Sequence, residues 1–176
     1  LVDDAGFRAE WQAIKQANKV DFAALALERT GISIDPSSLF DVQVKRIHEY
    51  KRQLLNLLHV VSRYQAIVDH PHAPNGEGWV PRTVIFAGKA ASAYQTAKAI
   101  VNLIHDVARV INSDPRVGDK LKLVFLPNYS VSLAEVINRI AAEDVPPPST
   151  IKPELRGDLE NILLKAVQRE PDRRYG

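Results

Sequence analysis

Residues 40–54 read FDVQVKRIHEYKRQL and carry four cationic side chains within eight positions. These are Lys45, Arg46, Lys51 and Arg52, and His48, Glu49 and Tyr50 lie among them. Crowded lysine and arginine side chains repel one another unless a negative group lies between them, so the pattern indicates a site for phosphate or another anion. A solvated basic turn on the surface has the same composition, and charge alone favours that simpler interpretation.

The basic stretch lies between a predicted strand and a predicted helix. Residues 40–44 alternate apolar and polar side chains, a period of two that indicates a short strand with one packed face. From residue 51 the apolar residues recur at intervals of three and four, which predicts a buried helix over residues 51–68. The side chains expected to face inward are Leu54, Leu57, Leu58, Val61, Tyr64 and Val68.

Two further strands follow. Residues 83–87 and 121–126 are continuous apolar runs, which is typical of parallel strands covered on both faces. Gly88 and Lys89 follow the first run, but the spacing differs from that of a nucleotide-binding loop and favours a tight turn. Between the runs a helix is expected over about residues 92–112, with Ile100, Val101, Ile104, Val107 and Ile111 facing inward.

The alternation of strands and helices predicts an α/β fold with an open parallel sheet flanked by helices. Ligands of such sheets bind beyond the carboxyl ends of the strands, where the basic stretch lies. Before the sheet, two helices are expected. The first, over residues 5–19, has Asp3 and Asp4 as candidate caps and a packing face of Phe7, Trp11, Ile14 and Ala17 or Asn18. The second, over residues 21–29, ends at Gly31.

The amino-acid composition argues against several classes of function. The chain has 176 residues, of which 45% are hydrophobic and 25% charged, as in an ordinary globular protein. A net charge of +2 argues against nucleic acid as a partner, and the absence of cysteine excludes disulfides. With no long apolar run and no signal-peptide pattern, we expect no membrane contact and a cytoplasmic location. His70 and His72 lack further ligands nearby, so we expect no metal site.

Three stretches resemble one enzyme family in the same order. VQVKRIHEYKRQLLN resembles, nearly letter for letter, a motif of the α-glucan phosphorylases, which include glycogen, starch and maltodextrin phosphorylase. PRTVIFAGKAASAYQTAKAIVNLI at residues 81–104 and LKLVFLPNYSVSLAEVI at residues 121–137 agree with it. FRAEWQAIKQANK and GISIDPSSLFDVQ are also similar, so the resemblance covers about residues 1–137. It implies a partial GT-B, or Rossmann-like, domain from the start of the family's C-terminal half.

The resemblance also implies a reaction. In this family, phosphate attacks the terminal α-1,4-linked glucose of a glucan and glucose 1-phosphate is released. Pyridoxal phosphate assists through its own phosphate group, and the enzymes are commonly homodimers. Two phosphates held close together need several cations around them, which is a physical reason for the basic stretch.

By the family's motif, four residues contact phosphate or the cofactor. Arg46 and Lys51 correspond to catalytic residues that bind the substrate phosphate, and Lys45 to a residue that faces the cofactor phosphate. Tyr129 matches a tyrosine beside the cofactor ring.

The resemblance assigns two more tyrosines to the substrate. Tyr50 matches a residue that contacts a glucose hydroxyl, and Tyr94 matches an aromatic residue at the mouth of the cleft. Tyr94 is also the first inward position of its expected helix, so a role in the core is the alternative. For His48, an internal hydrogen bond is favoured over a role as general base, because the cofactor phosphate transfers the proton in this family.

The sequence departs from the family pattern after SLAEVI. The family continues into a glycine-rich loop and an asparagine-methionine-lysine run whose lysine carries the pyridoxal. This chain has no methionine, and only Gly157 and Gly176 follow Gly118. We therefore expect no covalently bound cofactor. Because the family's N-terminal domain is also missing, we expect no activity from the chain in isolation.

The last part of the chain has a different character. Residues 138–150 contain Pro146, Pro147 and Pro148 and read as an extended linker. Within residues 151–176, ELRGDLENILLKAVQREPDRRYG resembles the end of the catalytic domain of bacterial serine/threonine kinases, and a short helical tail is expected. Arg174 matches an arginine that braces the kinase activation segment, which is absent here. The chain thus reads as a chimera of a phosphorylase fragment and a kinase fragment, and a non-catalytic anion-binding or structural module is the alternative function.

Overall fold

The computed structural model describes residues 4–73, 78–130, 133 and 136–137 and has the expected α/β fold. Its elements are α1 (Ala5–Thr30), β1 (Leu39–Val44), the 3-10 helix η1 (Glu49–Lys51), α2 (Gln53–Asp69), β2 (Arg82–Ala87), α3 (Gln95–Ser113) and β3 (Leu121–Leu126). All three predicted strands are confirmed. The predicted linker, the kinase-like tail and Arg174 lie outside the described residues.

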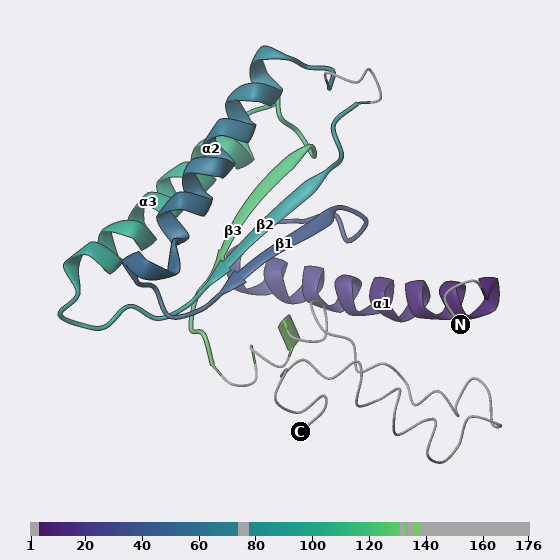
Figure 1. Cartoon of the computed structure of the whole chain (residues 1–176), viewed down its shortest axis with the longest axis horizontal. Coiled ribbons are helices and arrows are strands. Elements are labelled where there is room, and N and C mark those ends of the chain that lie inside the picture. The colour runs from purple at the N-terminus through teal and green to yellow at the C-terminus, as the bar shows by residue number, and fades with distance from the viewer. Residues whose placement is uncertain (1–3, 74–77, 131–132, 134–135, 138–176) are drawn as a thin grey trace.

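The strands form one parallel sheet in the order β1-β2-β3. Leu39 pairs with Arg82, and Arg82 pairs with Leu121, so the strands begin level with one another. Helices α2 and α3 lie on one face of the sheet and α1 lies on the other (Figure 1). Successive strand-helix-strand crossovers are right-handed in nearly all proteins, which places α2 and α3 on the same face when the strands are added in one direction. The result is a partial Rossmann-like domain.

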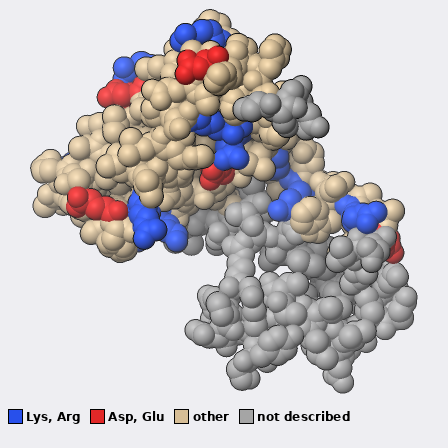
Figure 2. Space-filling view, turned by 45° about the horizontal axis from the view of Figure 1, so that its top comes forward, with Lys and Arg blue, Asp and Glu red and all other residues tan. Residues whose placement is uncertain are grey.

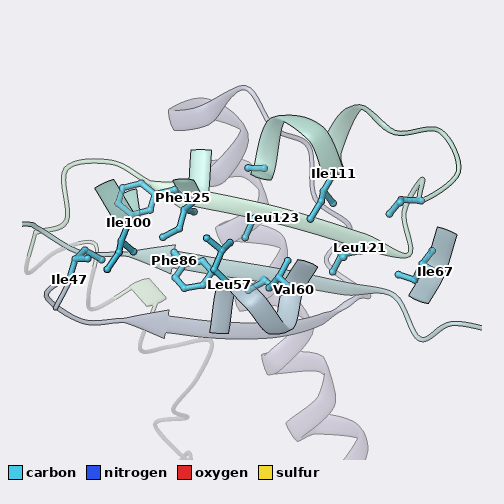
Figure 3. Close-up of a cluster of buried hydrophobic side chains, with 14 of the residues drawn as sticks. Ile47, Leu57, Val60, Ile67, Phe86, Ile100, Ile111, Leu121, Leu123 and Phe125 are labelled. Atoms are coloured by element: carbon cyan, nitrogen blue, oxygen red, sulfur yellow. The ribbon is translucent and has the colours of Figure 1, made fainter. Parts of the chain in front are cut away.

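A hydrophobic core fills the space between the sheet and helices α2 and α3 (Figure 3). Its largest fully buried members are Leu57 and Ile67 from α2, Ile104 and Ile111 from α3, and Phe86, Leu121 and Leu123 from the strands. A second core, on the α1 face, contains Phe22 and Ala26 with Ile85, Val124 and Leu126. The alternate residues of β2 and β3 therefore enter different cores, which explains their continuous apolar sequences.

Helix α1 corrects two predictions. The two expected helices are one continuous helix, because nothing at residue 20 breaks the helical pattern. Its ends are as expected: Asp4 accepts hydrogen bonds from the N–H groups of Gly6 and Phe7, and Gly31 closes the helix at φ 70°. The predicted packing face is buried only in part: Phe7, Ile14 and Asn18 are half-buried and Trp11 is 37% exposed, whereas the fully buried residues of the helix are Phe22 and Ala26. The amino-terminal turns of α1 extend away from the sheet (Figure 1).

Helix α2 begins two residues later than expected and turns a different face to the sheet. Its buried residues are Gln53, Leu57, Val60 and Ile67. Of the predicted inward residues, Leu57 is buried and Tyr64 and Val68 are partly buried against the core, whereas Leu54 and Leu58 are 40% and 55% exposed. In α3, which begins at Gln95 rather than near residue 92, Ile100, Ile104 and Ile111 are buried as predicted, while Val101 and Val107 are partly buried.

Candidate functional site

The basic stretch continues the sheet for a few residues beyond β1. The N–H group of Lys45 donates to the carbonyl of Ala87 at 3.1 Å, and that of Ile47 donates to the carbonyl of Lys89 at 3.2 Å. The side chain of Ile47 is 2% exposed and belongs to the core between the sheet and helices α2 and α3. The basic turn, residues 45–52, is therefore fixed both by backbone hydrogen bonds and by the buried side chain of Ile47.

Gly88 allows this turn to approach the loop after β2. A Cβ atom at Gly88 would lie 2.1 Å from the carbonyl oxygen of Lys45, which is far inside van der Waals contact. The expected tight turn is thus also a point where two backbones touch. Only glycine fits at this position without a shift of the basic turn.

Gln53, the first residue of α2, holds the turn from the other side. Its Nε2 donates to the carbonyl of Arg46 at 3.0 Å, and its Oε1 accepts from the N–H group of His48 at 3.3 Å. The side chain is fully buried, so these bonds replace those that water would make. Arg52, just before it, has φ 62°, a left-handed conformation that sharply redirects the chain into the helix.

A second glutamine fixes η1. Gln43 on β1 donates from Nε2 to the carbonyl of Lys51 at 2.9 Å, and its Oε1 accepts from Asn56 on α2, also at 2.9 Å. The side chains that position the basic turn are therefore neutral amides, and the turn is held without using its cations.

The cationic side chains are left available. Lys45 and Arg46 are exposed and Lys51 is half-buried. Within the described part of the chain, none of the three forms an ion pair with an acid. A hollow of about 580 Å³ runs along the outer edge of β1 and is lined by Val42, Gln43, Val44, Lys45, Tyr50, Lys51 and Ile137. Two lysines and a tyrosine thus border one open hollow.

Aromatic rings form a row beside the cations. The His48 ring lies between those of Tyr50 and Tyr94, with centroids 4.2 and 5.0 Å away. The Tyr94 hydroxyl donates to the Glu49 carboxylate, and this hydrogen bond raises the pKa of Tyr94. Glu49, the acid of the basic stretch, is therefore held by a tyrosine and not by a neighbouring cation.

His48 differs from expectation. No described residue forms a hydrogen bond with its buried Nδ1 atom, so the predicted internal hydrogen bond is not found at that atom. Its ring contacts and its backbone N–H group hold it instead. Tyr94 is not the first inward residue of its helix, because it is the N-cap of α3 and packs at the edge of the core.

The structure gathers five of the six predicted site residues at the end of β1. Lys45, Arg46, Tyr50 and Lys51 lie on the basic turn and η1, and Tyr94 joins them through Glu49. The sixth, Tyr129, follows β3 and packs against the core on the α1 face. Tyr129 thus lies beyond the end of β3, and β2 separates β3 from β1 in the sheet.

Sequence reasoning missed the residues that position the turn. Gln43, Ile47 and Gln53 were not singled out, and Gly88 was assigned only a turn. One signal was available for Gln53: it lies four and seven positions before Leu57 and Val60, at the spacing of a buried helical face. A glutamine at such a position needs buried hydrogen-bond partners.

The face drawn in Figure 2 has no single large patch of positive charge. Lys and Arg side chains occur in small groups on the face drawn in Figure 2, with Asp and Glu side chains near several of them. No group of three or more potential metal ligands occurs among the residues that the structure describes. The helices in the same residues are all too short or too polar to cross a membrane.

Comparison with known proteins gives consistent similarities. A family model described as carbohydrate phosphorylase matches residues 1–147. The glycogen phosphorylase of Pasteurella multocida is 53% identical over 144 residues, which are 82% of this chain and 17% of that protein. The α-glucan phosphorylase H isozyme of Solanum tuberosum is 53% identical over 137 residues, which are 78% of this chain and 16% of that protein. The chain thus spans about a sixth of the length of these curated relatives.

Proposed function

The chain belongs to the carbohydrate phosphorylase family, and on that premise we propose that it is the phosphate-binding part of an α-glucan phosphorylase. The proposed reaction is the attack of phosphate on the terminal α-1,4-linked glucose of a glucan, with release of glucose 1-phosphate. One observation carries the proposal: Lys45, Arg46 and Lys51 lie unpaired among the described residues, on a turn that neutral groups hold in place.

Each cation has a proposed task. Arg46 and Lys51 bind the substrate phosphate, and their positive charge stabilises the negative charge of the reacting phosphate. Lys45 binds the phosphate group of pyridoxal phosphate. Tyr50 orients the glucose unit through its hydroxyl, and it is suited to this because its side chain is 69% exposed at the hollow. Tyr94 borders the entrance.

The described residues fit the phosphate group of the cofactor but include no identified lysine for its covalent attachment. Exposed Lys45 provides a charged donor, and Tyr129 is the candidate to lie beside the ring. When bound, the cofactor supplies a phosphate group that exchanges a proton with the substrate phosphate. We propose that the remaining contacts, the second half of a GT-B cleft and any dimer interface come from sequence that the relatives have beyond this stretch, so that the chain alone is inactive.

The test is a titration of the chain with inorganic phosphate, followed by backbone amide chemical shifts. We expect saturable shifts at residues 45–51 with millimolar affinity, on the order of 4 kcal/mol, because few groups close the site. Arg46→Ala should weaken binding at least several-fold, and added salt should weaken it in both proteins. Arg109→Ala, which removes an exposed arginine of α3 paired with Asp106, is the matched control. Equal phosphate responses of wild type and Arg46→Ala would contradict the proposal.

A further inference from the structure

Two arginines meet at the opposite end of the sheet from the basic turn. Arg82 is the first residue of β2, and Arg63 lies on the third turn of α2. Arg82 pairs in register with Leu39, which is six residues before Lys45 on the adjacent strand. At about 3.3 Å per residue, the two sites are about 20 Å apart along the sheet. An anion at one site therefore does not contact the other.

The contacts of these arginines leave donors unused. Arg63 donates from Nη2 to the carbonyl of Val80 at 2.9 Å, and its guanidinium lies 5.2 Å from the centre of the Trp79 ring. Arg82 lies 3.5 Å from Asp41 across the strand pair, measured from Nη1 to Oδ2. The Nε atoms of both arginines are buried without a hydrogen-bond partner among the described residues. A bound water or ion is one explanation of a buried donor without a partner.

The charges at this point do not balance. Asp41 makes a single long contact with Arg82, and Arg63 forms no ion pair among the described residues. The hydrogen bond of Arg63 to Val80, two residues before Arg82, places the two cations near each other. Burial lowers the pKa of Arg63, and the positive charge of Arg82 lowers it further. A guanidinium remains charged at neutral pH regardless, because its ordinary pKa is so high. A bound anion would relieve the repulsion between the arginines.

We propose that Arg63 and Arg82 form a binding site for a tetrahedral oxyanion, a phosphate group either free or carried by a small molecule. Phosphate suits the pair because guanidinium groups donate two parallel hydrogen bonds to it, and one phosphate can accept from two arginines at once. Asp41 competes with the anion for Arg82. The site is independent of the proposed catalytic phosphate site, since it shares no residue with the basic turn.

The experiment follows the arginine Nε–H resonances of the whole chain during titration with inorganic phosphate. We expect saturable shifts of the Arg63 and Arg82 signals with phosphate and with sulfate, and none with sodium chloride at equal ionic strength. Arg63→Gln should weaken binding at this site at least tenfold, whereas Arg46→Ala should leave it unchanged. A titration with glycerol 3-phosphate separates free phosphate from a phosphate monoester as the preferred ligand, and saturable binding of either supports the site.

Asp41→Asn gives the sharper test. If the carboxylate only holds Arg82 in place, its loss should weaken any anion binding; if it competes with the ligand, its loss should tighten phosphate binding several-fold. We expect the second result. Unchanged or weaker binding in Asp41→Asn, equal binding in Arg63→Gln and wild type, or equal shifts with chloride would each overturn the proposal. Because neither substitution removes an apolar core residue, the comparison does not depend on a variant that fails to fold.

Discussion

The loops at the two ends of the sheet are held in place by different chemistry. At the carboxyl end, the basic turn is positioned by Gln43, Gln53 and the bare backbone of Gly88. At the amino end, the loop between α3 and β3 is positioned by charges. Asp114 accepts from Arg116 Nη2 at 2.6 Å and from the Tyr64 hydroxyl at 2.8 Å.

The difference has a physical consequence. A cation that forms a close ion pair is not free to bind a ligand, and Arg116 holds the pKa of Asp114 well below its usual range, with help from Tyr64. Neutral side-chain amides form hydrogen bonds with backbone groups and leave the charges of nearby cations unchanged. The carboxyl end therefore keeps its lysines and arginine available, while the amino-end loop uses its charges for structure.

The largest expected effect comes from adding a methyl group at Gly88, where two backbone segments touch. In Gly88→Ala the new methyl group meets the Lys45 carbonyl, so the basic turn must move away from the sheet. We expect a loss of about 3 kcal/mol in the free energy of unfolding, measured by urea denaturation, together with loss of the phosphate response.

The control for this variant is Gly118→Ala, at the amino end. A Cβ atom there meets nothing nearer than 3.9 Å, so only the cost of its positive φ remains. We expect about 1 kcal/mol and an unchanged phosphate response. Equal losses in the two variants would mean that the close backbone contact at Gly88 is not important for stability.

Replacing the buried amide should have an intermediate effect. Gln53→Leu keeps a similar volume but leaves the Arg46 carbonyl and the His48 N–H group without partners, which should cost about 2 kcal/mol. Hydrogen exchange should be faster at residues 46–49 than in wild type. Gln65→Leu, an exposed position on the same helix, is the control. If it costs as much as Gln53→Leu, the loss reflects a change in the helix and not the loss of the Gln53 hydrogen bonds to Arg46 and His48.

The smallest expected effect is the pH dependence of the amino-end loop. The folded pKa of Asp114 lies below its unfolded value, so its stabilising contribution is present above the unfolded pKa and is lost as the pH falls toward the folded one. In Asp114→Asn the free energy of unfolding should therefore fall less between pH 5 and pH 3 than in wild type. Urea denaturation at both pH values measures this. Parallel pH profiles would show that the Asp114 contacts add no stability, as is common for exposed ion pairs.

Much of the fold could be predicted because its signals are local. Continuous apolar runs indicated β2 and β3, alternation indicated β1, and Gly31 marked the end of α1. The faces of the helices were less predictable. Leu54 and Leu58 suit a buried stripe by type, but the buried face of α2 contains Gln53, Leu57 and Val60, and these leucines are exposed. Hydrophobicity alone does not indicate which of two neighbouring stripes is buried.

The sequence by itself determined the cations, their order along the turn and the family to which they belong. Tertiary structure decided how the turn is held and which cations stay unpaired. The contact between Gly88 and Lys45 joins residues that are 43 positions apart, and the meeting of Arg63 with Arg82 needs α2 and β2 to pack side by side. Local patterns carry no information about such pairs, because the distances between them are fixed only when the sheet assembles.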